Sequence, residues 1–238
     1  MYLLIDREGK TYLVKANEDI HTKDGVIKKE KLKFNSIVET HLGKKFFVLR
    51  PNIIDFIKKA KLGPQRISLK DCGLIAAYTG ISSGSKVLDA GTGSGVLAMF
   101  LANIVAPKKL VSYEIREDFA KIAKENFKKA GIKNIILKME NIYEGISEKN
   151  LDLITLDLPE PWKVIEHAKK SLKVGGYLVA YSPSIEQTKK FFSSLGESFY
   201  SETIECLVRE WDMEVLRPYS RMLAHTGFIT FARFLGSK

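Results

Sequence analysis

The sequence predicts two parts: a small β-rich domain over residues 1–62 and an α/β domain with a mostly parallel sheet over residues 63–238. Two observations lead to this fold class. In the first part, short β-branched and aromatic runs alternate with turn residues. In the second part, apolar runs of strand length alternate with segments long enough for helices, an order typical of parallel strands joined by right-handed crossovers.

Four runs in the first part predict strands: Tyr2–Ile5, Thr11–Val14, Ser36–Glu39 and Lys45–Leu49. Glycines between these runs, as in Glu8-Gly9 and Asp24-Gly25, predict turns. A helix is predicted after Pro51, over Ile53–Ala60. The pair Gly63-Pro64 marks its end, and we therefore place the boundary between the two parts there.

The second part begins with a regular alternation of elements. The predicted strands are Lys86–Asp89, Leu110–Glu114, Ile135–Lys138, Leu151–Leu156 and Tyr177–Tyr181. The predicted helices between them are Val96–Val105, Glu117–Ala130, Pro161–Ser171 and Ile185–Leu195. Two strand-like runs, Phe199–Leu207 and Phe228–Phe234, then follow with no clear helix between them. They predict a terminal hairpin that places one antiparallel strand in the sheet.

The net charge of +10 is unevenly distributed. Residues 1–62 hold 14 basic and 8 acidic side chains, a net +6 in about a quarter of the chain. Such a surface favours a polyanion, and tRNA, rRNA or DNA would all satisfy it. A soluble, lysine-rich surface without a nucleic-acid partner would give the same composition, so charge alone does not decide.

Export, membrane insertion and metal binding are not expected. Met1–Ile5 is followed at once by Asp6-Arg7-Glu8, which leaves no signal peptide, and we expect a cytoplasmic protein. The long uncharged stretch 90–107 is interrupted by glycines and is not a membrane span. Two cysteines and four separated histidines form no metal-binding spacing.

A glycine-rich turn follows the first strand of the α/β domain, in the order Asp89-Ala-Gly91-Thr-Gly93-Ser-Gly95. A dinucleotide fingerprint needs its third glycine one place later, where this chain has Val96, and a nucleoside-triphosphate loop needs a lysine after the turn. The observed spacing matches the S-adenosylmethionine (SAM) turn of class I methyltransferases. Its backbone N–H groups would meet the carboxylate of the methionine moiety.

Acidic and amide side chains follow the next strands. Glu114 ends the second strand and can accept hydrogen bonds from ribose hydroxyls, although it could instead cap the following helix. Asn141 and Ile142 follow the third strand, where the loop is expected to flank the adenine of the cofactor. Asp157 begins the sequence Asp-Leu-Pro-Glu-Pro-Trp162 after the fourth strand, at the sheet edge where such folds bind ligands.

Together these pieces resemble the archaeal and bacterial tRNA (adenine-N1)-methyltransferases, which modify position 58 of the T-loop. The similar segments, in order, are Gly63-Pro64-Gln65, Lys70-Asp71, 89–95, 113–120, 157–162, 174–176, 181–183, Arg217-Pro218 and 225–233. They extend over the whole of residues 63–238. Before that, Thr40-His41-Leu42-Gly43 and Arg50-Pro51 fit the β-rich N-terminal domain of the family.

The resemblance implies a class I SAM-dependent methyltransferase fold, Rossmann-like, with SAM as cofactor, tRNA as partner and a homotetramer as the usual assembly. It implies Asp157 as the catalytic carboxylate. When the two residues of the loop after the third strand are added, the expected cofactor-binding residues are Gly91, Thr92, Gly93, Ser94, Gly95, Val96, Leu97, Glu114, Phe119, Asn141, Ile142 and Asp157. Two positions differ from the family pattern: Asn141 replaces an Asp, and Leu69 replaces the proline before Lys70.

The predicted activity is methyl transfer to N1 of adenosine 58, with adenosine 57 left open. In this hypothesis Asp157 accepts a hydrogen bond from the N6 amino group, and Arg217, Arg221, Arg233 and the N-terminal domain are candidates for phosphate contacts. Three alternatives remain at this point. They are a methyltransferase acting on another RNA, a protein or a small molecule, a non-catalytic RNA-binding paralogue, and a nicotinamide oxidoreductase.

Overall fold

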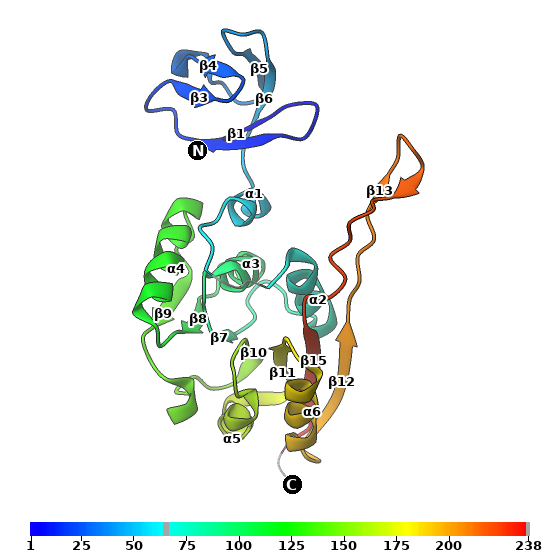
Figure 1. Ribbon diagram of the computed structural model, residues 1–238. Helices are drawn as coiled ribbons and strands as arrows, with labels where there is room; N and C mark the ends of the chain where they lie inside the picture. The colour runs from blue at the N-terminus through cyan, green and yellow to red at the C-terminus, as the bar shows by residue number, and fades with distance from the viewer. Residues whose placement is uncertain (64–66, 237–238) are drawn as a thin grey trace. The chain divides into compact units, whose positions relative to one another are not determined.

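The computed structural model describes residues 1–63 and 67–236. The chain divides into two compact units, Met1–Ala60 and Lys61–Lys238 (Figure 1). Pro64 and Gln65 of the family-like segment lie outside the described residues. None of the helices in the described part of the chain has the length and apolar character needed to cross a bilayer.

The N-terminal unit is a small antiparallel β structure. Its four-stranded sheet has the order β2-β1-β6-β5. The strands are β1 (Tyr2–Ile5), β2 (Thr11–Val14), β5 (Ser36–Glu39) and β6 (Lys45–Leu49), which confirms the four predicted runs. The hairpin of β3 (Ile20–Thr22) and β4 (Gly25–Ile27) was not predicted, because three-residue strands carry too little periodicity. A 3-10 turn, η1 (Lys29–Lys31), and a short helix, α1 (Ile53–Lys58), complete the unit.

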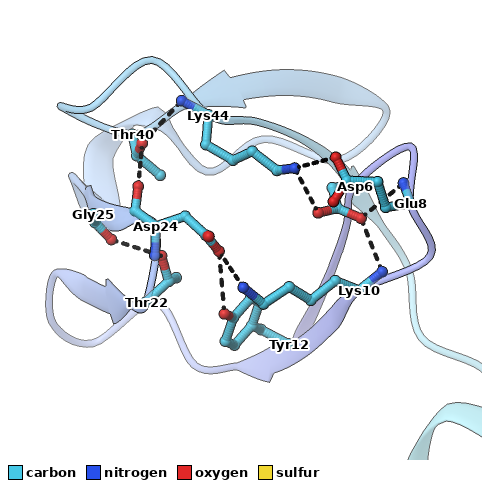
Figure 2. Close-up of polar contacts among 9 residues, drawn as sticks. All are labelled: Asp6, Glu8, Lys10, Tyr12, Thr22, Asp24, Gly25, Thr40 and Lys44. Carbon is cyan, nitrogen blue, oxygen red and sulfur yellow. Dashed lines mark hydrogen bonds and ion pairs between the residues drawn. The ribbon is translucent and has the colours of Figure 1, made fainter.

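A network of ion pairs joins the loops of this unit (Figure 2). Lys44 Nζ lies 3.1 Å from Asp6 Oδ2 and 2.8 Å from Glu8 Oε1, and Lys10 Nζ lies 2.6 Å from Asp24 Oδ2. Hydrogen bonds to Glu8 and Asp6 raise the pKa of Lys44 to about 12. The network therefore holds together the loop that contains Lys44, the β1–β2 turn and the β3–β4 turn. The positive charges of Lys10 and Lys44 are paired within it.

The second unit is built on a seven-stranded sheet of order β12-β15-β11-β10-β7-β8-β9. Five strands run parallel, and β15 is antiparallel to both of its neighbours, as the predicted terminal hairpin requires. The strands are β7 (Val87–Ala90), β8 (Leu110–Tyr113), β9 (Ile135–Lys138), β10 (Leu151–Leu156), β11 (Leu172–Ser182), β12 (Phe199–Glu205) and β15 (Phe228–Phe234).

The main helices are α2 (Leu69–Thr79), α3 (Val96–Val105), α4 (Glu117–Ala130), α5 (Ile165–Ser171) and α6 (Ile185–Ser194). Two predictions were wrong in detail. The single helix expected over Pro161–Ser171 is a 3-10 turn, η3 (Pro161–Val164), followed by α5, and β11 begins at Leu172 rather than at Tyr177. A two-stranded hairpin of β13 (Trp211–Asp212) and β14 (Arg217–Pro218) lies beyond the ends of β12 and β15 (Figure 1).

The parallel strands bring the predicted polar residues to one edge of the sheet. Ala90 pairs with Tyr113 on one side and with Leu156 on the other, and these residues end β7, β8 and β10. The glycine turn, Glu114 and Asp157 follow them directly. The carboxyl ends of strands in an open α/β sheet are the usual place for a ligand.

Candidate active site

Two of the three glycines in the turn between β7 and α3 leave no room for a side chain. Gly91, Gly93 and Gly95 all have positive φ angles, of 86°, 53° and 79°. A Cβ on Gly91 would lie 2.1 Å from the backbone oxygen of Asp157, and one on Gly95 would lie 2.4 Å from the ring of Phe127. The turn therefore brings its backbone into direct contact with the loop that carries Asp157.

The start of α3 has backbone N–H groups available for a ligand. Gly95 is the N-cap residue and has no side chain to cap the helix. Val96 and Leu97 are buried, and their side chains anchor the first turn in the core. Ser94 lines the cavity described below, so an anion there would face the positive end of the helix dipole.

The buried carboxylate of Asp89 is linked by hydrogen bonds to the glycine turn. Asp89 accepts hydrogen bonds from Ser112 Oγ at 2.8 Å and from Thr155 Oγ1 at 2.8 Å, and Thr92 Oγ1 lies 2.6 Å from Ser112 Oγ. Burial raises the pKa of Asp89 to about 6, although the two hydroxyl donors oppose the shift. The Thr92 side chain thus points into the protein core and fixes the turn, while the backbone of Gly91 and Gly93 lines the cavity.

Glu114 is held by three backbone N–H groups. Oε1 accepts from Ile115 at 2.9 Å and from Arg116 at 3.0 Å, and Oε2 accepts from Gly93 at 2.9 Å. The carboxylate therefore both orders the start of α4 and holds the glycine turn. A carboxylate has about four acceptor positions. In this arrangement about one position is left, on Oε2, for a ligand hydroxyl.

One cavity of about 480 Å³ brings most of the predicted residues together. Phe119 lies in its wall, with the Arg116 guanidinium 3.8 Å from the ring centroid. Predicted residues that line the cavity are Gly91, Gly93, Ser94, Glu114, Phe119 and Asp157. Thr92, Gly95, Val96 and Leu97 were also predicted, but they are buried and do not line the cavity.

Asp157 is the second carboxyl group that lines this cavity, beside Glu114. Its side chain is exposed to the cavity and makes no hydrogen bond to any residue that the structure describes, while its backbone N–H donates to Ala90 at 2.9 Å. Burial among protein atoms, with the negative charges of Asp89 and Glu114, raises the pKa of Asp157 to about 7. A cation placed in the cavity would favour the ionised form.

Asn141 and Ile142 lie in a neighbouring hollow. Asn141 lines an open depression that shares Ile115 with the main cavity. Its Oδ1 accepts from Tyr143 N at 3.1 Å, so the side chain caps a 3-10 turn, η2 (Ile142–Glu144). Ile142 is buried beneath the depression. These two residues are thus adjacent to the cavity rather than inside it.

Gln187 and Tyr181 are among the cavity-lining residues that were not predicted as site residues. Gln187, in the first turn of α6, donates through Nε2 to the carbonyls of Leu158 at 2.9 Å and Pro159 at 2.8 Å. Both amide protons are used, so Oε1 is left as an acceptor. Tyr181 lines the cavity from the end of β11. Gln187 has no sequence signal of its own, and Tyr181 lies in the family-like segment 181–183 without a predicted role, because both act through elements that are distant along the chain.

Tyr181 is fixed by a buried cluster that joins the two ends of the unit. Its O–H donates to Thr226 O at 2.5 Å. Thr226 Oγ1 donates to Asp71 Oδ2 at 2.8 Å, and Lys70 Nζ lies 2.7 Å from both Asp71 Oδ1 and Thr226 Oγ1. Two segments singled out separately in the sequence, Lys70-Asp71 and 225–233, therefore meet behind the cavity.

Comparison with known proteins identifies the family of this chain. The family model described as the tRNA methyltransferase complex GCD14 subunit matches residues 63–216. This chain belongs to that tRNA methyltransferase family. Among curated relatives, the tRNA (adenine(57)-N(1)/adenine(58)-N(1))-methyltransferase TrmI of Methanocaldococcus jannaschii is 37% identical, over 97% of this chain and 94% of its own. The tRNA (adenine(58)-N(1))-methyltransferase TrmI of Thermus thermophilus is 34% identical, over 97% and 95%.

Solved structures of methyltransferases are also similar to this chain. The tRNA (m1A58) methyltransferase TrmI of Aquifex aeolicus has a TM-score of 0.83 and 27% identity, covering 99% of this chain and 97% of its own. A structure from Thermotoga maritima, titled a SAM-dependent O-methyltransferase, has a TM-score of 0.90 and 33% identity, covering 100% and 93%. The class I SAM-dependent methyltransferase fold predicted from the sequence is thereby confirmed, and a nicotinamide oxidoreductase is excluded.

The cavity of this methyltransferase fits SAM. Its volume lies within the usual range for small-molecule sites. The uncapped start of α3 suits a carboxylate and Glu114 retains an acceptor for a ribose hydroxyl, while the lack of a Cβ on Gly91 lets the Asp157 loop lie against the turn. Asp157 supplies a negative charge for a cationic ligand.

Proposed function

We propose that this chain methylates N1 of adenosine 58 in the T-loop of tRNA, with SAM as the methyl donor. Membership of the tRNA methyltransferase family carries the proposal, together with the named activity of the M. jannaschii and T. thermophilus relatives. Such a substrate is present in the cytoplasm, where we expect the protein to act. SAM supplies an activated methyl group.

The residues of this chain would act on the adenine through hydrogen bonding and charge. N1 has an in-plane lone pair, so no base is needed to create a nucleophile. The product carries positive charge over N1 and N6. Asp157, once ionised, accepts a hydrogen bond from the N6 amino group, orients N1 and stabilises the charge that develops. Gln187 Oε1 is a second acceptor in the same cavity.

The proposed site residues divide by role. Asp157 is the catalytic carboxylate. Glu114 would bind the ribose of SAM, and Phe119 would contact the cofactor from the cavity wall. The glycine turn with the start of α3 would bind the carboxylate, and Asn141 with Ile142 would flank the adenine. The adenine of the tRNA has to leave its stack to reach Asp157, because N1 lies on its pairing edge.

Mapping of methylated nucleotides tests this function. An unmodified tRNA transcript is incubated with SAM and the purified chain, digested, and analysed by mass spectrometry. N1-methyladenosine at position 58 is the expected product, and the same digest reports whether position 57 is modified. A methyl group on a ribose or on another base would contradict the proposal and would favour the chemistry named for the T. maritima structure.

We also propose that the chain forms a homo-oligomer through the segment 207–223, and a tetramer by resemblance. Large apolar side chains are exposed along this segment: Leu207, Val208, Trp211, Met213, Val215, Leu216, Tyr219, Met222 and Leu223. So many large apolar side chains exposed along one short segment are uncommon on a monomer. Its three arginines and three acidic residues balance, which suits a self-complementary contact rather than RNA.

Light scattering of the purified chain tests the oligomer. Leu216 has a positive φ of 54°, a conformation that asparagine tolerates, so Leu216→Asn removes an apolar group without adding backbone strain. Combined with Met213→Gln, it should shift the wild-type oligomer to smaller species. A wild-type chain that is monomeric at micromolar concentration would refute the proposed assembly.

A further inference from the structure

An exposed aromatic stack lies on the N-terminal unit. The rings of Tyr2 and Phe34 are stacked, with centroids 4.4 Å apart and planes 24° apart. The guanidinium carbon of Arg50 lies 5.0 Å from the Phe34 centroid. Strand pairing assembles this group from three parts of the chain, since Leu3 pairs with Leu49 and Asn35 N–H donates to Val48 O at 2.8 Å.

The stack remains open to solvent. Phe34 is 40% exposed, although a phenylalanine side chain is more often inside a fold. Tyr2 packs partly against the core of the unit, so it provides a fixed base for the stack. Arg50 is exposed and makes no ion pair with a carboxylate in the part of the chain that the structure describes. A flat group could therefore add to this site without rearrangement of the core.

A set of exposed lysines directly precedes the stack. Lys29, Lys31 and Lys33 are exposed, and no ion pair joins them to any described carboxylate. The lysines of the ion-pair network differ, because Lys10 and Lys44 are turned toward carboxylates (Figure 2). The segment before Phe34 is therefore a set of cations that a phosphate backbone could reach.

We propose that Tyr2, Phe34 and Arg50 form a stacking site for an unpaired base of the RNA substrate, with phosphate contacts from Lys29, Lys31 and Lys33. Aromatic rings and guanidinium planes are the usual partners of splayed RNA bases, and lysines neutralise the flanking phosphates. The identity of the RNA as tRNA rests on the proposed function. The site is additional to the cavity that would bind SAM and the target adenine.

Binding of unmodified tRNA at several salt concentrations tests this site. Phe34→Leu retains an apolar side chain but removes the stacking surface, and should weaken binding roughly tenfold at every salt concentration. The slope of log affinity against log salt should stay unchanged. Lys31→Ala with Lys33→Ala should reduce that slope by about 0.7 to 0.9 for each phosphate that these lysines neutralise. Phe34→Trp should retain wild-type affinity.

Matched variants on other surfaces provide controls. Tyr200 is 63% exposed on β12, and Lys23 is exposed in the β3–β4 turn. Tyr200→Leu and Lys23→Ala should leave tRNA binding unchanged. Thermal unfolding of each variant, matched to the wild type, confirms that it is folded. In the methylation assay, Phe34→Leu should raise the KM for tRNA and leave kcat unchanged.

Two results would overturn the site. One is wild-type tRNA affinity and KM in Phe34→Leu, and the other is an equal loss in Tyr200→Leu. Failure of the proposed function has a different signature, because the wild-type chain itself would then leave tRNA unmethylated. A wild-type chain that methylates adenosine 58 while Phe34→Leu keeps a normal KM would refute only the stacking site.

Discussion

Replacement of Asp157 by asparagine should reduce activity and raise stability. Asparagine retains the shape and one acceptor oxygen but removes the negative charge. The lost electrostatic contribution should lower kcat by roughly 10²–10³, the scale for one preorganised group at a developing charge. Single-turnover methylation of tRNA at saturating SAM measures this loss. A variant with wild-type turnover would refute the catalytic role of Asp157.

The pKa of Asp157 gives the size of the stability change. A shift from 3.8 to about 7 corresponds to about 4 kcal/mol against the ionised form. Because the side chain is exposed to the cavity, screening by water reduces this to about 1–2 kcal/mol. The folded state keeps its proton up to about pH 7, whereas the unfolded chain loses it near pH 4. Wild-type stability is therefore lost progressively between these pH values.

Denaturant unfolding at pH 4, 5, 6, 7 and 8 checks this effect. Near pH 4, Asp157→Asn should be as stable as the wild type. As pH rises toward 7 the wild type loses stability relative to the variant, and above pH 7 the variant should be about 1–2 kcal/mol more stable. The exposed residue Glu117, changed to Gln, is the control and should show no such trend. A stability difference that does not depend on pH would refute the assignment of the raised pKa to Asp157.

The glycine turn, the ribose site and the loop after β10 give three further predictions. Gly91→Ala should abolish SAM binding in calorimetry, because its Cβ would meet the Asp157 carbonyl, whereas Gly84→Ala has the same φ of 86° with no neighbour within 4 Å and should bind normally. Glu114→Gln should weaken SAM binding at least tenfold, since the amide keeps one acceptor oxygen and its NH2 group cannot accept the remaining backbone N–H bonds. Gln187→Leu should lower kcat with little change in the SAM dissociation constant, because it removes the hydrogen bonds that hold the loop after β10 and the acceptor Oε1; unchanged kcat would contradict this.

Much of the fold could be predicted because its signals are local. The run from Val87 through Gly95 gives a strand, a tight turn and a helix start within nine residues, and the structure follows it. The strand and hairpin pattern at residues 199–234 also predicted the antiparallel strand. The helix α2 was not predicted, since its apolar residues form no clear stripe and its stability comes from contacts such as that between Asp71 and Thr226.

The sequence could predict those site residues that directly follow a strand of the parallel sheet. Glu114 and Asp157 follow apolar strands, and the sheet edge brings them to one cavity. Gln187 and Tyr181 reach the same cavity through pairings that span tens of residues, and no spacing in the sequence reports such pairings. The exposure of Phe34 was equally hidden, because an aromatic residue before a strand usually indicates a core position.

The position of β15 has a consequence for synthesis of the protein. Residues 228–234 lie between β12 and β11, so the sheet has a gap until they leave the ribosome. Thr226, just before this strand, is also needed to hold Tyr181 at the cavity. A nascent chain that has completed the glycine turn, Glu114 and Asp157 would thus still lack a finished active site.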